Sequence, residues 1–319
     1  MKYKIPALAS ILCSVLALIF LFSGMNIAGQ SFAIAALILG IVSFKKNGSA
    51  FSAFASFLPG AIMAWLYFTP GILPLLSLAL LITAAQNSFL QIFFPKIMYS
   101  VTWFKLSAGI CSIGLYLVAN FITPAAYQAW LFPGIFLLIS NLLSLLITKD
   151  LIALQKAAGS GFIDAGKKCP DFTLPDEEGR AVSSTDFLGK NLLIIFVRGD
   201  WCPGCHITLR AYQRNKEKFM EQNVHLLSIG PDPLGVNKEM VQKLGLDYHV
   251  LSDEKQKVAQ QFCVELQGKD AGTPENYEFV PLPATFLIDK NGMIRFTSRA
   301  DRPGELFYPD KIFEVMEAM

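Results

Sequence analysis

The first 149 residues contain no Asp, Glu or Arg, and this is the strongest constraint that the sequence places on the fold. Their only charges are seven lysines, whereas all 25 acidic residues lie from Asp150 onwards. Three stretches, 5–44, 47–95 and 106–148, carry no charge at all. Soluble proteins average about 25% charged residues, but this chain has 16%. The amino-terminal half is therefore expected to lie in a membrane.

Each uncharged stretch is long enough for two membrane-spanning helices, because about 20 apolar residues cross the hydrocarbon core. Turn-forming residues interrupt the stretches at 23–30, 69–71 and 123–124. A signal peptide is the alternative for the first segment, but a signal peptide precedes a soluble protein, and here apolar segments continue. We predict a transmembrane domain over 1–148, with the lipid bilayer as partner and with about six helices at 5–25, 28–44, 50–68, 72–94, 103–122 and 128–148.

The lysines indicate how this domain is oriented. Cytoplasmic loops of membrane proteins are enriched in Lys and Arg. Lysines precede the first predicted helix and follow the second, fourth and sixth, whereas the other connections are uncharged. This pattern predicts a bacterial-type inner membrane protein with both termini in the cytoplasm. A miscount of one span would place the carboxyl-terminal domain in the periplasm.

The remaining sequence has the composition of a soluble α/β domain. Residues 149–164 include Gly and Ser and are predicted to form a linker that begins as a short helical exit and continues as a flexible joint. Beyond it, the apolar run at Asn191–Val197 is typical of a buried strand. The net negative charge of this part argues against nucleic acid as a partner. Alternating patterns predict a mixed sheet covered by helices. Further strands are expected at 224–229, 284–288 and 293–297, a short segment at 248–251, and helices at 203–222, 236–245, 254–263 and 309–319.

The segment Trp201-Cys202-Pro203-Gly204-Cys205 contains the residues predicted to carry the chemistry. Cys202 follows a predicted strand and begins a predicted helix. The positive end of a helix and its free N–H groups favour a thiolate, so the pKa of Cys202 is expected below the usual value of about 8.5. Cys205 lies in the first helical turn, where it can attack a mixed disulfide on Cys202. Pro203 suits that turn, because its missing N–H costs little there.

A zinc site is the alternative interpretation of a Cys-x-x-Cys pair. Structural zinc needs four ligands, and the chain has no second pair and no histidine with ligand spacing to it. Cys-x-x-Cys directly after a strand in an α/β domain is typical of redox chemistry. We therefore predict a redox-active pair that uses neither metal nor cofactor.

The cysteine segment, from Phe196 to Arg210, resembles peroxiredoxin-like members of the AhpC/TSA (alkyl hydroperoxide reductase and thiol-specific antioxidant) family. Three further segments share the resemblance, which covers about 165–319: Cys169–Pro175, Leu251–Asp253 and Leu282–Asp289. The resemblance implies a thioredoxin-like fold with Cys202 as the attacking cysteine. It also implies a cis-proline at Pro283 facing the pair, and we include Thr285 of the same segment among the supporting residues; an ordinary trans-proline is the alternative.

The sequence departs from the family pattern beside the pair. Typical peroxiredoxins have Thr three residues before the attacking cysteine and Pro four residues before that Thr; here these positions are Gly199 and Ile195. The family also uses an Arg near the thiolate, for which Arg198 and Arg295 are candidates; a solvated charge is the alternative for each.

Three other residues have two interpretations. Asp200 could move protons for the pair or be an exposed turn residue. Cys169 and Cys263 could be additional resolving thiols or isolated packing residues.

These features predict a membrane-anchored antioxidant enzyme, a thiol–disulfide oxidoreductase or thiol-dependent peroxidase. Its substrate would be a peroxide or a protein disulfide, and its reductant an external thiol system such as a thioredoxin-type protein. The alternative is a membrane transport or sensing protein gated by the redox domain.

Overall fold

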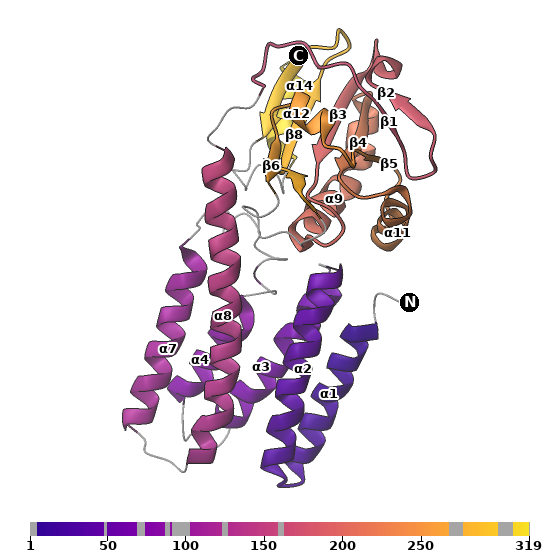
Figure 1. The fold of residues 1–319 in the computed structure, drawn as a ribbon. Coiled ribbons are helices and arrows are strands. Elements are labelled where there is room, and N and C mark those ends of the chain that lie inside the picture. Colours follow the sequence, from indigo (N-terminus) through magenta and orange to yellow (C-terminus); the bar gives the residue numbers. More distant parts are fainter. Residues whose placement is uncertain are drawn as a thin grey trace. The chain divides into compact units, whose positions relative to one another are not determined.

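The computed structural model describes residues 5–47, 50–68, 74–86, 90, 103–122, 127–158, 163–267, 277–298 and 309–318. The chain divides into two compact units, Met1–Lys149 and Asp150–Met319 (Figure 1). The first unit is helical and the second is built around a sheet.

A helix lies at each of the six positions predicted for the first unit. Four helices contain a stretch long and apolar enough to cross a membrane: Ile5–Phe22, Asn26–Ser43, Phe104–Ile122 and Trp130–Lys149. The other two contain shorter apolar stretches, Ala53–Leu66 and Leu75–Ala84. The six helices are α1 (Ile5–Phe22), α2 (Asn26–Asn47), α3 (Ala50–Phe68), α4 (Pro74–Ala84), α7 (Phe104–Ile122) and α8 (Tyr127–Ala158).

Helix α8 continues to Ala158, which confirms that the linker begins with a helical exit. The predicted helix at 72–94 is described only in part, and the predicted breaks at 69–71 and 123–124 lie outside the described residues.

Small side chains line the contacts between helices of the first unit. Ser10 donates from its Oγ to the carbonyl of Ala36 on α2 at 2.6 Å and to that of Ala55 on α3 at 2.9 Å. A Cβ at Gly40 would lie 2.6 Å from the Cα of Ser56, so α2 and α3 can approach only because residue 40 is glycine. Large apolar side chains instead point outwards, among them Leu8, Leu12, Ile110, Leu138 and Leu142.

The second unit contains a five-stranded sheet in the order β5-β4-β3-β8-β9. Its parallel strands are β3 (Asn191–Phe196), β4 (Val224–Gly230) and β5 (His249–Ser252). Strand β8 (Ala284–Ile288) runs antiparallel to β3, and β9 (Ile294–Ser298) antiparallel to β8. With helices packed against it, this sheet confirms the predicted thioredoxin-like fold.

The central strand β3 is buried on both faces, as its apolar run predicted. Leu193 and Ile195 pack into one core with Leu209 and Tyr212 of helix α9 (Pro203–Arg214). The alternate residues of β3 pack into a second core with Phe262 and Phe286. The cysteine pair belongs to the first core, which also contains side chains of α11 (Leu234–Leu244) and α14 (Asp310–Glu317).

Several elements differ from the predicted bounds. The helix predicted over 203–222 is divided at Asn215 into α9 and α10 (Lys216–Glu221). Asn215 interrupts it because its φ and ψ, −103° and 8°, are not helical. The helix predicted at 254–263 is reduced to α12 (Lys257–Gln261) because Gln256 adopts a positive φ.

Short hairpins complete the second unit. Strand β1 (Thr173–Pro175) pairs with β2 (Ala181–Ser183), and β6 (Glu265–Gln267) pairs with β7 (Phe279–Pro281). Between β8 and β9, only Gly292 of the predicted Asn-Gly turn has a positive φ. Asp289 stabilises this turn, because its Oδ1 accepts the N–H groups of Asn291 and Met293 at 2.9 Å each.

Candidate redox site

A tight turn after strand β3 presents the two cysteines. Cys202 is the N-cap of α9, and its N–H donates to the carbonyl of Gly199 at 3.2 Å. Gly199 has a φ of +122°, which L side chains rarely adopt. A Cβ there would also lie 3.0 Å from a carboxylate oxygen of Asp232. The conformation and the close contact explain why this position is Gly rather than the Thr of typical peroxiredoxins.

Both thiols accept hydrogen bonds from backbone amides. The N–H of Cys205 donates to Sγ of Cys202 at 3.4 Å, and the N–H of Arg198 donates to Sγ of Cys205 at 3.3 Å. No disulfide joins these two thiols, and both are buried, Cys202 being 8% exposed and Cys205 3%. Burial raises the pKa of Cys205 well above its usual value, and Cys202 raises it further, although the Arg198 cation lowers it. Cys205 is therefore a protonated thiol at neutral pH.

Arg198 is buried beside the pair and is not a solvated charge. Its guanidinium carbon lies 4.6 Å from the centroid of the Trp201 ring, a cation–π distance. The Trp201 ring lies in turn 6.4 Å from the ring of Tyr277. Pro203 occupies the first turn of α9. The structure thus brings Arg198, Trp201 and Pro203 together with both cysteines.

Asp200 is held in a cluster of charges and is not a free turn residue. Its Oδ1 accepts Nζ of Lys243 from α11 and lies 3.1 Å from Nε2 of His206 on α9. Burial alone would raise the pKa of Asp200, but the bonds from His206 and Lys243 outweigh it and hold the pKa below its usual value. Burial also lowers the pKa of His206. Asp200 is therefore an ionised carboxylate that links the turn to two helices.

Asp232 and Tyr277 were missed by the sequence analysis. Asp232 is buried and follows strand β4. Its Oδ2 accepts the N–H of Asp200 at 2.7 Å, and its Oδ1 accepts the hydroxyl of Tyr277. Ends of neighbouring parallel strands meet at one edge of a sheet, which could have indicated Asp232. No sequence signal indicates Tyr277, which is 45 residues further along the chain.

Pro283 and Thr285 flank the start of β8. Ala284 pairs with Phe196 at the end of β3, so Pro283 lies at the sheet edge from which the cysteine turn leaves. The predicted cis bond is wrong, because the described residues contain no cis peptide. Strand β7 ends at Pro281 and β8 begins at Ala284, so only Leu282 and Pro283 join the two strands. The Thr285 hydroxyl pairs with Oγ of Ser298 on β9.

The other candidates lie away from the pair. Arg295 forms an ion pair with Asp289 at 2.7 Å, beside the turn between β8 and β9. Cys169 packs into the core on the opposite face of the sheet, where burial raises its pKa to about 12. Cys263 is an exposed residue with a φ of +55° next to α12. None of the three belongs to the cluster of contacts around Cys202 and Cys205 described above.

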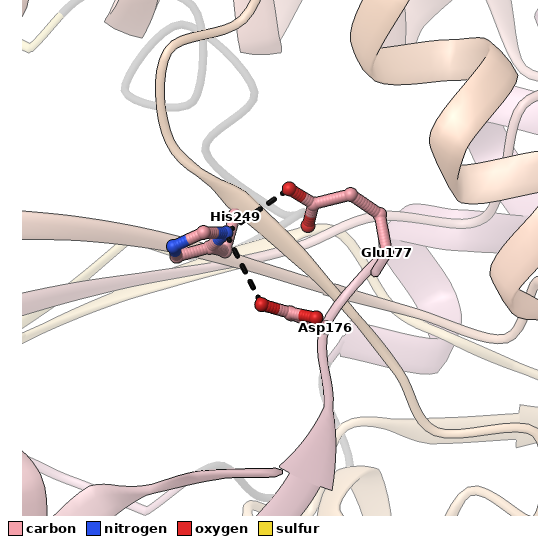
Figure 2. Close-up of side chains that lie close together, drawn as sticks. All are labelled: Asp176, Glu177 and His249. Carbon is pink, nitrogen blue, oxygen red and sulfur yellow. Dashed lines mark hydrogen bonds and ion pairs between the residues drawn. The ribbon is translucent and has the colours of Figure 1, made fainter. Parts of the chain in front are cut away.

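A separate cluster joins the turn after β1 to strand β5. Figure 2 shows the imidazole of His249 beside the carboxylates of Glu177 and Asp176. Nδ1 of His249 lies 3.0 Å from Oε1 of Glu177 and 3.6 Å from Oδ2 of Asp176. The three groups have the spacing of metal ligands, but the Asp176 carboxylate already pairs with Arg180 at 2.9 Å. The prediction of a metal-independent pair stays a prediction.

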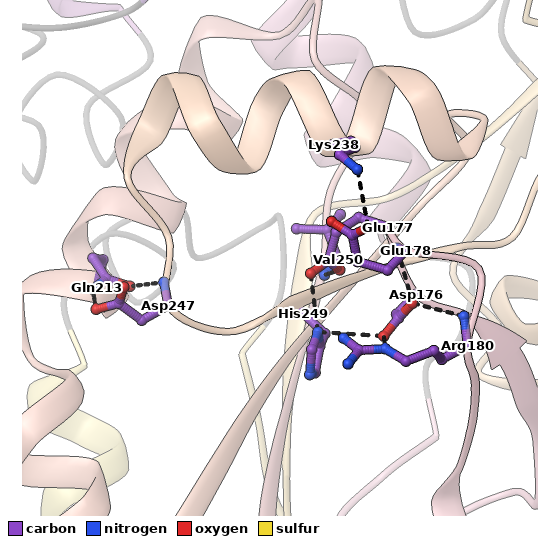
Figure 3. Close-up of polar contacts among 9 residues, drawn as sticks. All are labelled: Asp176, Glu177, Glu178, Arg180, Gln213, Lys238, Asp247, His249 and Val250. Carbon is purple, nitrogen blue, oxygen red and sulfur yellow. Dashed lines mark hydrogen bonds and ion pairs between the residues drawn. The ribbon is translucent and has the colours of Figure 1, made fainter.

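The wider contacts in Figure 3 indicate a structural role, because they hold the turn between β1 and β2 against strand β5. Oε2 of Glu177 accepts the N–H of Val250 on β5 at 3.1 Å. Oδ1 of Asp176 accepts the N–H groups of Glu178 and Arg180 at 2.9 Å each. These bonds close the turn between β1 and β2 and attach it to strand β5. Further surface pairs link Lys238 to Glu178 and Gln213 to Asp247.

Replacing Asp176 with Asn is expected to lower the free energy of unfolding by about 2 kcal/mol at pH 7, because a buried charged acceptor is lost. Burial by itself raises the pKa of Asp176, but bonds from Arg180 and Glu178 give a net lowered pKa. A carboxyl whose pKa is lower in the folded state stabilises the fold at pH values above its unfolded-state pKa, about 3.9. This stabilisation is lost as the pH falls through the folded-state pKa. In urea unfolding, the free energy of unfolding of the wild type should therefore exceed that of Asp176→Asn at pH 7, and this difference should shrink below about pH 4. The exposed Asp171→Asn is the control, and an equal loss there would contradict the assignment.

The sequence of the second unit has known relatives. Residues 165–297 match the AhpC/TSA family. The peroxiredoxin Q of Sedum lineare, a chloroplastic protein, is 32% identical over 134 residues, which are 42% of this chain and 67% of that relative. The chain belongs to the AhpC/TSA family. The matched residues do not include the first, helical unit.

Other relatives and structures are similar over the same region. The chloroplastic peroxiredoxin Q of Oryza sativa subsp. japonica is 32% identical over 137 residues, 43% of this chain. The chain spans 59% of the length of that relative. The structure of peroxidoxin BcpB from Mycobacterium tuberculosis has a TM-score of 0.43 and 22% identity, covering 49% of this chain and 97% of its own. Peroxiredoxin Q of Xanthomonas campestris has a TM-score of 0.42 and 19% identity, covering 48% of this chain and 97% of its own.

Proposed function

We propose that this chain is a thiol-dependent peroxidase whose Cys202 attacks the peroxide and whose Cys205 resolves the product. The pair at the start of α9 carries the proposal, because Cys202 is the N-cap of the helix and its sulfur accepts the N–H of Cys205, which favours a thiolate there, whereas burial raises the pKa of Cys205. The relatives in the AhpC/TSA family named peroxiredoxin Q support peroxide as the substrate.

The two cysteines account for a complete two-electron cycle. The Cys202 thiolate attacks one peroxide oxygen, the O–O bond breaks, and the other oxygen leaves as water or an alcohol after taking a proton. Cys202 is then a sulfenic acid. Cys205 attacks its sulfur, a disulfide forms and water leaves. Two thiols of an external reductant, such as a thioredoxin-type protein, then restore the pair by disulfide exchange.

The same pair can reduce a protein disulfide instead, so the substrate must be tested directly. The reduced full-length chain in detergent would be mixed with hydrogen peroxide, and separately with insulin plus dithiothreitol. Peroxide loss that depends on Cys202 supports the proposal. Precipitation of insulin without peroxide loss would show a disulfide reductase instead.

We propose further that the first unit anchors the enzyme in a bacterial inner membrane. Leu and Ile side chains face outwards while Ala, Ser and Gly line the helix contacts, which is typical of packing within lipid. The uneven distribution of lysines supports cytoplasmic termini.

The anchor proposal predicts that the chain stays in the membrane fraction after washing at alkaline pH and leaves it only with detergent. A fusion of alkaline phosphatase after residue 160 should be inactive, because that enzyme folds in the oxidising periplasm. An active fusion would place the redox domain outside and overturn the orientation. Release of the chain by the alkaline wash would overturn the anchor.

A further inference from the structure

One buried carboxylate contacts the turn before Cys202 without belonging to the cysteine pair. Both oxygens of Asp232 lie within 3.1 Å of the point where a Cβ on Gly199 would be. The carboxylate therefore fills the space that a side chain at residue 199 would need. Asp232 is fully buried, so this contact excludes water from the back of the turn.

The same carboxylate fixes the backbone of the turn. Oδ2 of Asp232 accepts the N–H of Asp200, the residue between Gly199 and Trp201, at 2.7 Å. The turn is closed by the bond from Cys202 N–H to the Gly199 carbonyl. Any movement of Gly199 and Asp200 would therefore move Cys202 relative to the first turn of α9.

Asp232 is itself held from two sides. The hydroxyl of Tyr277 donates to its Oδ1, and the Tyr277 ring packs near Trp201. Its main-chain carbonyl accepts Oγ of Ser252 at 2.6 Å and Nδ2 of Asn237 at 3.1 Å. The main-chain carbonyl of Asp232 thus ties the residue to β5 and α11, and its carboxylate links Tyr277 to the cysteine turn.

We propose that Asp232 is a positioning residue of the redox site: fixed by Tyr277, its carboxylate holds the Gly199–Asp200 turn so that Sγ of Cys202 stays aligned with the N–H of Cys205. This inference rests on the proposed function only in naming Cys202 as the attacking thiol. The other charged or titratable groups around the turn are Arg198, Asp200, Cys205, His206 and Lys243.

The alignment of Cys202 can be measured without turnover. The full-length reduced chain would be treated with iodoacetamide between pH 5 and 10, and Cys202 labelling followed by peptide mass spectrometry. Asp232→Ala should raise the apparent pKa of Cys202 by about one unit, with labelling about tenfold slower below that pKa, because the thiolate loses its aligned N–H donor. An unchanged or lowered apparent pKa would overturn the proposal.

The variant Asp232→Asn separates position from charge. Asn keeps an oxygen for the Asp200 N–H, and its amide can donate to the Tyr277 oxygen. Its labelling profile should therefore stay close to that of the wild type. If the charge of Asp232 were what mattered, the Asn variant would lower the apparent pKa, because a nearby negative charge disfavours a thiolate. That outcome would overturn a positioning role.

The variant Tyr277→Phe provides a second test if Asp232→Ala does not fold. It removes the hydroxyl that holds Asp232 but keeps the ring beside Trp201. Labelling of Cys202 should slow about threefold, as expected for one lost hydrogen bond; a wild-type profile in this variant would overturn the proposal. The matched control is Asp253→Asn, a buried carboxylate that instead caps helix α12 by accepting the N–H groups of Val258 and Ala259.

Labelling of Cys202 by iodoacetamide does not require turnover, so it tests the role of Asp232 separately from the peroxidase proposal. A wild-type chain that does not consume peroxide would contradict the peroxidase proposal, while the shifts in the labelling of Asp232→Ala and Tyr277→Phe would still be expected. Wild-type labelling in either variant would contradict the positioning role alone.

Discussion

Replacing Cys202 with Ser should abolish peroxide consumption, with a loss of at least about 1,000-fold. The hydroxyl of Ser remains protonated where a thiol at a helix N-terminus ionises, so the variant lacks the nucleophile. The fold should be unaffected, because the substitution is nearly isosteric and the N-cap oxygen can still accept the N–H of Cys205. The measurement is peroxide loss by the reduced full-length chain, with circular dichroism to compare folding.

The control for Cys202→Ser is Cys263→Ser. Cys263 is exposed and lies outside the contacts of the redox turn. The Cys263→Ser variant should therefore consume peroxide at the wild-type rate. If the two Ser variants lost activity equally, or if neither lost it, Cys202 would not be the attacking thiol.

The elements next to the cysteine pair were predictable because local signals agree there. The apolar run of β3 has the length of a buried strand, and the structure places both faces of that strand in cores. Pro203 directly after Cys202 marks a helix start. The position of the pair at a strand–helix junction therefore follows from about fifteen consecutive residues.

The environment of the pair was not predictable in the same way, because it is made by distant segments. Asp232, Lys243 and Tyr277 lie 32, 43 and 45 residues from their partners in sequence. Each is a common polar residue that carries no motif. The burial of Arg198 also depends on the ring of Trp201 and the fold around it, so sequence alone left a solvated charge as the alternative for this residue.

The departure at residue 199 shows how the structure changes the meaning of a sequence difference. From sequence, Gly199 is a missing Thr and counts against peroxide as substrate. In the structure, its positive φ and the adjacent carboxylate of Asp232 make Gly a requirement of this turn. Gly at residue 199 therefore goes with a different set of polar groups next to Cys202, in which the Asp232 carboxylate lies beside the turn, and not only with the loss of a Thr hydroxyl.

Replacing Cys205 with Ser should separate the two chemical steps. The N–H that contacts Cys202 belongs to the backbone of residue 205 and is retained. The Ser hydroxyl can also accept the N–H of Arg198, which now donates to the Cys205 sulfur. The attack on peroxide should therefore proceed at a rate near that of the wild type, whereas formation of the intramolecular disulfide becomes impossible.

The expected result for Cys205→Ser is one equivalent of peroxide consumed per chain, followed by arrest. Steady-state turnover with a thioredoxin-type reductant should fall by at least about 100-fold, because no disulfide is available for exchange. Mass spectrometry should find Cys202 as a sulfenic acid, and excess peroxide should convert it to the sulfinic acid. A small thiol that attacks the sulfenic acid directly should restore part of the turnover. Continued wild-type turnover with the protein reductant would show that Cys205 is not the resolving thiol.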